Sequence, residues 1–406
     1  PLPIWRCENK HEICVGSLAE LGKLAGQELS KLDPHRPFVD DIKFKCDKCS
    51  ETMQRIPEVI DCWYDSGAMP FAQWGYPHQS GSVEKFNAAY PADFICEAID
   101  QTRGWFYTLM TIGTLVFDKS SYKTVLCLGH ILDKDGRKMS KHLGNVLEPM
   151  PLMNQHGADA VRWYMLAAGS PWSARRVGHD AISDVVRKTL LTYWNTISFF
   201  TLYANAADFT VSKVSDDLTL MDRWILSELN KLILGVDKAL ENFDSQEAGQ
   251  LLAAFIDDLS NWYVRRSRRR FWDADPVALN TLYFCLKNLT LLLAPMVPFI
   301  AEHVWQSLIK VAESDQVESV HLADFPVANK KMVDENLSIS VALSRRLVEL
   351  GRSARAESGV KIRQPLSRAL ISASGWVGLD QQLTDQISDE LNVLNLDDIS
   401  SAGSDL

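Results

Sequence analysis

The longest regular feature of the sequence is a series of apolar residues at helical spacing between residues 182 and 309. The residues that would share helix faces are Ile225, Leu229, Leu232, Val236 and Leu240, then Leu252, Phe255, Leu259 and Trp262, then Leu282, Leu286, Leu289 and Leu293. Helices that each carry one apolar face must pack against one another to bury those faces. The pattern therefore predicts an all-α helix bundle, in which 205–220 forms a surface connection.

A different pattern precedes the bundle. Residues 94–96 and 125–128 are short apolar runs that each lead into a polar turn, as buried parallel strands do. Residues 102–117 and 158–166 have the spacing of helices. Strands that alternate with helices are typical of a doubly wound α/β fold, whose ligand site lies at the carboxyl ends of the strands. We expect such a unit here.

Length, composition and charge set limits on this organisation. The 406 residues, 46% hydrophobic and 23% charged, suffice for about two to four domains and exclude a wholly disordered chain. We expect domains at 1–175, 176–328 and 329–406, with fraying in the acidic end, 388–406. No uninterrupted apolar run reaches the roughly 18 residues that span a bilayer, so no membrane segment is expected. The net charge of −10 argues against non-specific coating of nucleic acid but allows a local basic patch.

The cysteines gather near the start of the sequence. Four of the eight, Cys7, Cys14, Cys46 and Cys49, lie in the first 49 residues. This distribution favours a reducing cytoplasm and one metal cluster over a secreted disulfide scaffold. The Cys-x-x-Cys pair at 46 and 49 is half of a tetrahedral zinc site, and Cys7 with either His11 or Cys14 can complete it. Of these two we take Cys14 as the fourth ligand, and His11 is the alternative. Four protein ligands would make the Zn²⁺ structural; the alternative is a degenerate site that holds no metal.

A polar loop after the second apolar run carries two lysines three residues apart. Its sequence, at 135–146, is Asp-Gly-Arg-Lys-Met-Ser-Lys-His-Leu-Gly-Asn-Val, with the lysines at 138 and 141. Such a loop can fold over a triphosphate, where ammonium groups neutralise the charge that grows on a transferring phosphorus. The simpler alternative is a solvated basic turn.

The longer string resembles the Lys-Met-Ser-Lys-Ser loop of class I aminoacyl-tRNA synthetases, including the Gly-Asn-Val that commonly follows it. The departure from the family pattern is His142, which stands in place of the last serine. The resemblance implies that Lys138 and Lys141 are catalytic, and that Met139 and Ser140 help to bind ATP together with its Mg²⁺.

A second segment, 96–106, reads Cys-Glu-Ala-Ile-Asp-Gln-Thr-Arg-Gly-Trp-Phe. Carboxylates at a strand end before a helix can hold an ammonium group or ribose hydroxyls, although Asp100 could equally cap the helix. The string resembles the adenylate-binding segment of the synthetases for isoleucine and valine. The resemblance implies that Glu97, Asp100 and Gln101 contact the aminoacyl-adenylate. Ala98 stands where the family more often has glycine.

A third segment, 59–71, contains Asp-Cys-Trp-Tyr-Asp-Ser-Gly. By itself it is compatible with a generic aromatic loop. It resembles the Asp-x-Trp-Phe-Asp-Ser-Gly segment of the same family, in which aromatic groups shape the amino-acid pocket. The resemblance implies that Trp63 and Asp65 belong to that pocket.

A basic run with aromatic neighbours occupies 261–272, Asn-Trp-Tyr-Val-Arg-Arg-Ser-Arg-Arg-Arg-Phe-Trp. Its arginines are Arg265, Arg266, Arg268, Arg269 and Arg270. Two interpretations remain open: ion pairs with Asp257, Asp258 and other helix carboxylates, or contacts with RNA phosphates. The string resembles the anticodon-binding bundle of isoleucyl-tRNA synthetases, where valyl enzymes usually diverge.

The resemblance covers most of the chain, with three motifs in the family's order and spacing. It implies a Rossmann-type α/β second half of a class I catalytic domain with a zinc knuckle at about 5–55, an anticodon-binding bundle, and a small C-terminal α/β junction segment. The implied activity is ATP-dependent ligation of isoleucine to tRNA(Ile) by a cytoplasmic monomer. The alternatives are a valine–tRNA ligase and a stand-alone tRNA-binding module without catalysis.

Two parts of the family pattern do not occur in these 406 residues: the His-Ile-Gly-His tetrad and the large inserted editing domain. The chain opens Pro-Leu-Pro-Ile-Trp, without an initiator methionine. We expect both parts to lie upstream of Pro1. Because the tetrad and the lysine loop act together on ATP in the family, we expect no measurable isoleucine-dependent ATP–pyrophosphate exchange from this chain alone.

Overall fold

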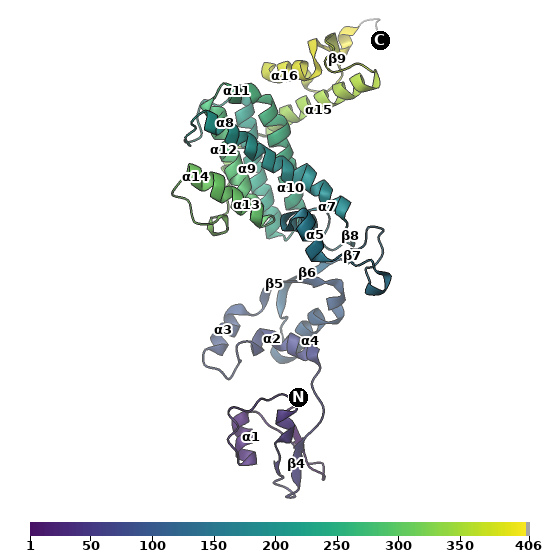
Figure 1. Cartoon of the computed structure of the whole chain (residues 1–406), viewed down its shortest axis with the longest axis vertical. Helices are drawn as coiled ribbons and strands as arrows, with labels where there is room; N and C mark the ends of the chain where they lie inside the picture. Colours follow the sequence, from purple (N-terminus) through teal and green to yellow (C-terminus); the bar gives the residue numbers. More distant parts are fainter. Residues whose placement is uncertain (403–406) are drawn as a thin grey trace. The chain divides into compact units, whose positions relative to one another are not determined.

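The computed structural model describes residues 1–402, apart from the side chains of Lys141 and Ala402. It divides into two compact units, Pro1–Leu128 and Gly129–Leu406 (Figure 1).

The first unit begins with a small antiparallel sheet and one helix. The sheet has the strand order β2-β1-β4-β3. The elements are β1 (Ile4–Arg6), β2 (Glu12–Cys14), α1 (Leu18–Ala25), β3 (Phe44–Lys45) and β4 (Thr52–Arg55). Trp5 is buried at the centre, where its Nε1 donates to the carbonyl oxygen of Ile42 at 2.8 Å. Apolar residues from all parts of this segment therefore share one core with the buried cysteines 7 and 46.

The rest of the first unit is a β-α-β segment with two further helices. The elements are α2 (Cys62–Ala72), α3 (Ser82–Ala89), β5 (Ala92–Ala98), the 3₁₀ turn η2 (Ile99–Arg103), α4 (Trp105–Phe117) and β6 (Tyr122–Leu128). β5 and β6 pair in parallel, so the predicted alternation of strand and helix is confirmed.

The β5–β6 sheet is covered unevenly. Ile95 is buried against Phe106 and Leu109 of α4, whereas the adjacent Phe94 is 37% exposed. Successive strand residues point to opposite faces, so α4 covers only one of the two. The sequence predicts buried strands, and that prediction is wrong for the face that carries Phe94.

Helix α2 lies close against α4 at Gly67. A Cβ atom at this position would lie 2.7 Å from Cδ1 of Ile112 and 2.8 Å from the carbonyl oxygen of Thr108. Only a residue without a side chain lets the two helices approach this closely. The glycine of the Asp-Ser-Gly string therefore fixes where α2 sits.

The second unit opens with a short parallel strand pair and three helices. These elements are β7 (Ile131–Leu132), α5 (Pro149–His156), α6 (Ala158–Ala167), β8 (Arg175–Arg176) and α7 (His179–Val185). The helix predicted at 158–166 is thus α6, to within one residue.

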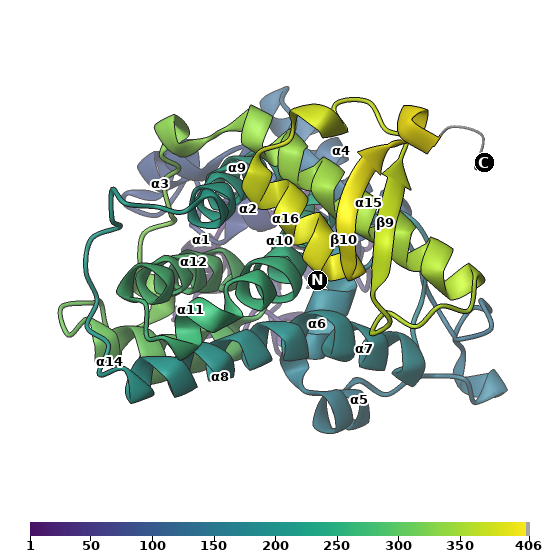
Figure 2. The same ribbon diagram turned by 90° about the horizontal axis from the view of Figure 1, so that it is seen from above.

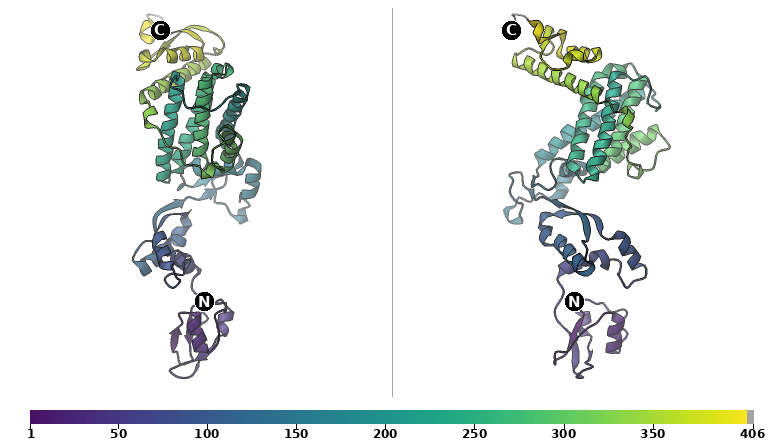
Figure 3. Two further views of the ribbon diagram at one scale, coloured as in Figure 1. Left: turned by 90° about the vertical axis from the view of Figure 1, so that its left-hand side faces the viewer. Right: turned by 180° about the vertical axis from the view of Figure 1, so that it is seen from behind.

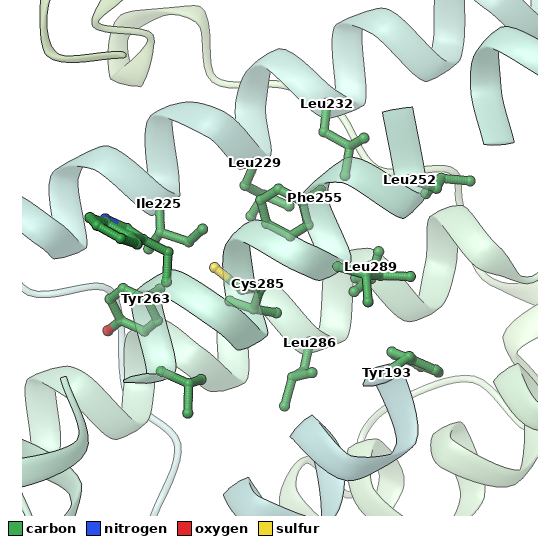
Figure 4. Packing of buried hydrophobic residues seen from close by; sticks show 14 of the residues in the cluster. Tyr193, Ile225, Leu229, Leu232, Leu252, Phe255, Tyr263, Cys285, Leu286 and Leu289 are labelled. Atoms are coloured by element: carbon green, nitrogen blue, oxygen red, sulfur yellow. The ribbon is translucent and has the colours of Figure 1, made fainter. Parts of the chain in front are cut away.

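The helix bundle follows, and its helices run side by side (Figure 3). They are α8 (Leu191–Ala206), α9 (Leu220–Glu241), α10 (Ser245–Asp257), the π-helical turn η5 (Asp258–Val264), α11 (Arg268–Trp272), α12 (Pro276–Leu293), α13 (Pro298–Val304) and α14 (Lys310–Ala312). The predicted helix faces form one buried core, in which Ile225, Leu252 and Leu286 are fully buried (Figure 4). The bundle and the 205–220 connection are confirmed.

Helix α12 has the length and apolarity of a membrane-spanning helix, with 18 residues and a mean hydropathy of 1.3. In the structure 67% of it is buried inside the protein, because it is a central helix of the bundle. Core helices of globular proteins share this length and composition, so α12 is weak support for a membrane span.

The C-terminal segment pairs a long helix with a small α/β layer (Figure 2). It contains α15 (Glu335–Glu357), β9 (Leu366–Ile371), α16 (Gln381–Leu391) and β10 (Val393–Asp398), with β9 and β10 parallel. The expectation that 388–406 frays is wrong for residues up to 402, because Leu391 and Val393 are buried there. Residues 403–406 lie outside the described part of the chain.

Candidate functional site

The carboxyl end of β5 opens into a pocket in the first unit. The pocket has a volume of about 450 Å³ and is lined by Trp63, Ser66, Met69, Glu97, Gln101 and Trp105. Three of the residues singled out in the sequence, Trp63, Glu97 and Gln101, are thus brought together. The pocket offers a carboxylate and an amide beside two indole rings.

Gly104 lets the backbone lie close to the side chains of Gln101 and Trp63. A Cβ atom there would lie 2.7 Å from Oε1 of Gln101 and 3.0 Å from the ring of Trp63. Oε1 of Gln101 accepts a hydrogen bond from the backbone N–H of Trp105 at 2.8 Å, which caps the start of α4. Capping therefore belongs to Gln101 and not to Asp100, whose Oδ2 accepts from Nε2 of Gln101 at 3.4 Å.

Asp65 does not line this pocket. It lies exposed in the first turn of α2, a helix whose N-terminus is capped by Asp61, which accepts from the backbone N–H of Trp63 at 2.8 Å. A carboxylate in the first turn of a helix interacts favourably with the helix dipole, so Asp65 can stabilise α2 without contacting a ligand.

The lysine loop in the second unit is held by two residues that sequence reasoning did not assign. Oδ1 of Asp133 accepts from the backbone N–H of Arg137 at 2.8 Å. Asn145 donates to Oδ2 of Asp133 at 2.8 Å and accepts from the backbone N–H of Ser140 at 2.9 Å. The hydrogen bond from Asn145, with that from Arg137, lowers the pKa of the Asp133 carboxyl. The sequence signal for these hydrogen bonds is the Gly-Asn-Val string, which contains Asn145.

The two faces of the lysine loop differ in their exposure to solvent. Met139 lines a cavity of about 600 Å³ together with Arg137, Asn145 and residues 176–181, whereas Lys138 is exposed. The side chain of Lys141 lies outside the described part of the chain. Lys138 is thus presented to solvent from a loop whose backbone is fixed on its inner side.

Four side chains of the N-terminal sheet can hold a metal ion. The ligand atoms of Cys7, His11, Cys46 and Cys49 all lie within 4.8 Å of one another. Sγ of Cys7 is 3.7 Å from Sγ of Cys49, and Sγ of Cys46 is 3.5 Å from Nδ1 of His11. Tetrahedral Zn²⁺ with usual bond lengths places two sulfurs ~3.8 Å apart and sulfur and nitrogen ~3.5 Å apart. The donor set and its spacing therefore fit zinc.

The fourth member of this group is His11, whereas the metal set favoured from the sequence has Cys14. Cys14 lies on β2, and with Glu12 it shares the exposed face of that strand because side chains alternate. Burial raises the pKa of Cys7, whereas hydrogen bonds, that of Asn9 first, lower the pKa of Cys49 to about 6. A low thiol pKa favours the thiolate that binds a metal.

Three of the five arginines in the basic run are held in ion pairs. Arg265 and Arg266 bind Glu390 of α16 at 2.7 and 3.0 Å, and Arg270 binds Asp222 of α9 at 2.8 Å. Pairing with helix carboxylates is therefore as expected from one of the two interpretations, but the two partners named from the sequence are wrong, because Asp257 and Asp258 pair with Arg345 of α15. Glu390 and Asp222, which do pair with arginines of the basic run, come from helices that are distant from it in the sequence.

Arg268 and Arg269 remain at the surface. The side chain of Arg269 is 90% exposed and lies 3.9 Å from Asp273, which is the limit of an ion pair. Arg268 is exposed, as is the neighbouring Trp272, 61% of which is accessible. Exposed arginines beside an exposed indole can contact phosphates and stacked bases of RNA.

Two family models match parts of the chain. Residues 1–178 match the family model described as tRNA synthetases class I (I, L, M and V). Residues 222–370 match the model described as the anticodon-binding domain of tRNA ligase.

Similar curated proteins are isoleucine–tRNA ligases. Over its whole length the chain is 60% identical to that of Streptomyces avermitilis and 58% identical to that of Thermobifida fusca, and it is 45% identical to that of Clostridium kluyveri over 98% of its length. It covers 39%, 40% and 38% of these relatives, so it spans about two fifths of their length.

Solved synthetase structures share the fold. LeuRS of Agrobacterium radiobacter K84, in its complex with tRNA and LeuAMS, has a TM-score of 0.61 and 22% identity, over 82% of this chain and 41% of that one. Methionyl-tRNA synthetase of Mycobacterium tuberculosis, bound to methionyl-adenylate, has a TM-score of 0.53 and 17% identity, over 70% and 58%. The chain belongs to the class I aminoacyl-tRNA synthetase family.

Proposed function

We propose that the whole protein to which this chain belongs is an isoleucine–tRNA ligase. The chain would supply the adenylate-binding residues, the ATP-binding lysine loop and the tRNA-binding bundle. The domains would be 1–175, the second half of a Rossmann-type catalytic domain, 176–328, the anticodon-binding bundle, and 329–406, a junction segment. The proposed setting is the cytoplasm, and the proposed state is a monomer.

The observation that carries this proposal is the pocket at the end of β5. Its carboxylate, Glu97, can accept hydrogen bonds from the ammonium group or the ribose hydroxyls of an aminoacyl-adenylate. Trp63 and Trp105 offer apolar walls to a branched aliphatic side chain. The identity of 45–60% with isoleucine–tRNA ligases supports isoleucine over valine.

The reaction has two steps. The carboxylate of isoleucine attacks the α-phosphorus of ATP, the bond to the β-phosphate oxygen breaks, and pyrophosphate leaves. A ribose hydroxyl at the 3′ end of tRNA then attacks the acyl carbon of the adenylate, and AMP leaves. In the first step Lys138 and Lys141 would stabilise the charge that grows on the phosphate oxygens.

The proposed adenylate-binding residues would act mainly by holding the adenylate in one orientation. Gln101 is fixed by its bond to the start of α4, and Asp100 is held beside it, so both can orient the adenylate without losing further side-chain freedom. Mg²⁺ would enter with ATP and share the neutralisation of its phosphates. Zn²⁺ at Cys7, His11, Cys46 and Cys49 would be structural, because four protein ligands leave no open position.

Amino-acid-dependent ATP–pyrophosphate exchange tests the proposal. The whole protein should exchange with isoleucine, and Lys138→Ala should lower the rate by about a hundredfold, since it removes charge stabilisation of the transition state. Lys123→Ala, which removes an exposed lysine paired with Asp93, is the matched control and should keep the wild-type rate. Exchange that depends on valine in preference to isoleucine would assign the protein to the valine enzymes.

A further inference from the structure

A basic cavity lies where the helix bundle meets the C-terminal segment, within the second unit. Its volume is about 880 Å³, and it is formed by the end of η5, by α15, by the turn after α15 and by α16. Its basic lining residues are Arg265, Arg352, Arg355, Lys361 and Arg363, and its acidic lining residues are Asp389 and Glu390.

The acidic residues of the cavity are already neutralised. Glu390 accepts from Arg265 at 2.7 Å, from Arg266 at 3.0 Å and from Arg352. Asp389 pairs with Arg266 at 3.2 Å. Within residues 1–402, no ion pair engages the three remaining cations of the lining, at positions 355, 361 and 363. The cavity therefore keeps a surplus of positive charge.

Arg355 adds unused hydrogen-bond donors to that charge. The residue is only 6% exposed. Its Nη2 donates to the carbonyl oxygens of Lys361 at 2.9 Å and of Gln364, which holds the turn after α15 in place. Its Nε and Nη1 are buried and have no hydrogen-bond partner among the described residues, as is also true of Nε of Arg352. Buried donors without acceptors are costly, so an anionic acceptor in the cavity would stabilise this arrangement.

We propose that this cavity binds a phosphoryl group, supplied by the sugar–phosphate backbone of tRNA. Guanidinium groups match the geometry of phosphate oxygens, and three uncompensated cations suit a group with several anionic oxygens. Arg265 belongs both to the cavity and to the basic run that presents Arg268 and Arg269 at the surface, so one RNA strand could contact both. The choice of tRNA as the source rests on the proposed function, whereas the phosphoryl chemistry does not.

The test compares two double variants of the whole chain. Lys361→Ala with Arg363→Ala removes two exposed cations of the cavity. Arg187→Ala with Arg346→Ala removes two exposed arginines elsewhere, whose side chains are 70% and 61% accessible. Binding of a tRNA(Ile) transcript is measured by filter binding over a series of KCl concentrations. Binding of inorganic phosphate alone is measured by isothermal titration.

The cavity variant should bind tRNA about tenfold or more weakly, with a salt slope reduced by about 1–2, while the control variant should match the wild type. Arg355→Ala should act in the same direction, provided that circular dichroism shows a folded chain. Loss of phosphate binding with unchanged tRNA binding would assign the cavity to a free phosphate compound.

Unchanged tRNA affinity, salt slope and phosphate titration in the cavity variant would overturn the proposal. If the wild-type chain binds no tRNA at all, the proposed function fails at that point. The phosphate titration of the same variants then still decides whether the cavity is a phosphoryl site.

Discussion

Gly104 shows how one residue without a side chain shapes the candidate adenylate pocket. The position has φ −135° and ψ −112°, and it brings the backbone within reach of both Gln101 and the ring of Trp63. A Cβ atom there would press against the oxygen of Gln101, which caps α4, and against the ring of Trp63, which lines the pocket. The pocket therefore depends on the absence of a Cβ atom.

Gly104→Ala should displace Gln101 and lower kcat/KM for isoleucine in the exchange reaction by about tenfold or more, because a shift of about 1 Å in a binding group is costly to catalysis. Gly378→Ala is the control, since a Cβ atom there meets nothing within 4 Å. Steady-state kinetics of both variants in the whole protein decide the matter. Equal kinetics would mean that this segment does not touch the substrate.

A buried carboxylate in the bundle gives a pH-dependent contribution to stability. Burial raises the pKa of Asp222, but hydrogen bonds from Arg270, Thr219 and Tyr263 outweigh burial, so its pKa is lower than usual. A carboxyl with a lowered folded-state pKa stabilises the fold above its unfolded value of about 3.9. That stabilisation is lost as the pH falls through the folded value.

Asp222→Asn should therefore reduce the free energy of unfolding at pH 7 by about 3 kcal/mol, because it leaves the charge of Arg270 without its buried partner. The difference from the wild type should shrink as the pH falls below about 4. Urea denaturation at pH 7 and pH 3 measures both values. A difference of the same size at the two pH values would contradict the ionised pair.

At the scale of elements, sequence patterns predict those helices and strands whose formation depends on residues close together in the chain. The apolar spacing of the bundle places its helices correctly, because burial of one face is a local signal. The helix predicted from residue 102 begins at Trp105, since Gly104 interrupts it with a non-helical backbone. The parallel pairing of β9 with β10, and the fray predicted at 388–406, depend on contacts between distant residues, which spacing alone does not carry.

In the candidate sites, too, contacts between residues close in the chain could be predicted, and contacts between distant residues could not. Glu97 and Gln101 lie together in the pocket because a strand end and a helix start are adjacent in the chain, whereas Trp63 lines the same pocket from α2. The partner of Arg265 and Arg266 is Glu390, more than 120 residues away, and no local pattern could reveal it. The choice of His11 over Cys14 follows from strand alternation in β2, which becomes visible only with the register of the sheet.

The metal group offers a test at this scale. Purified wild-type chain and Cys14→Ser should each contain about one zinc ion, whereas Cys46→Ser should contain almost none, because zinc is held by four ligands. His11→Ala should also lower the zinc content. Metal analysis by mass spectrometry measures it. Loss of zinc in Cys14→Ser with retention in His11→Ala would reverse the assignment of the fourth ligand.

The basic run should divide into two functional classes. Arg268→Ala with Arg269→Ala should weaken tRNA binding at unchanged thermal stability, since both side chains are exposed. Arg270→Ala should instead destabilise the bundle by about 3–5 kcal/mol, because it leaves Asp222 buried and unpaired. Filter binding and denaturation curves of both variants separate the classes. Full tRNA affinity in the first variant would remove the exposed pair from the RNA interface.

At the scale of the whole molecule, the residues of the proposed reaction come from both compact units. The pocket proposed to bind the adenylate lies in the first unit, and the lysine loop lies near the start of the second. The family's histidine tetrad does not occur in these 406 residues. The chain alone should therefore give no measurable isoleucine-dependent exchange, and a rate near that of ordinary synthetases would contradict this expectation.

The most direct test of the central claim is the charging of tRNA by the whole protein. Purified protein, ATP, Mg²⁺ and a tRNA(Ile) transcript are incubated with radiolabelled isoleucine or valine, and acid-precipitable label is counted. The account predicts stable charging with isoleucine and its loss in Lys138→Ala. Stable charging with valine, or no charging with either amino acid by folded, tRNA-binding protein, would contradict it.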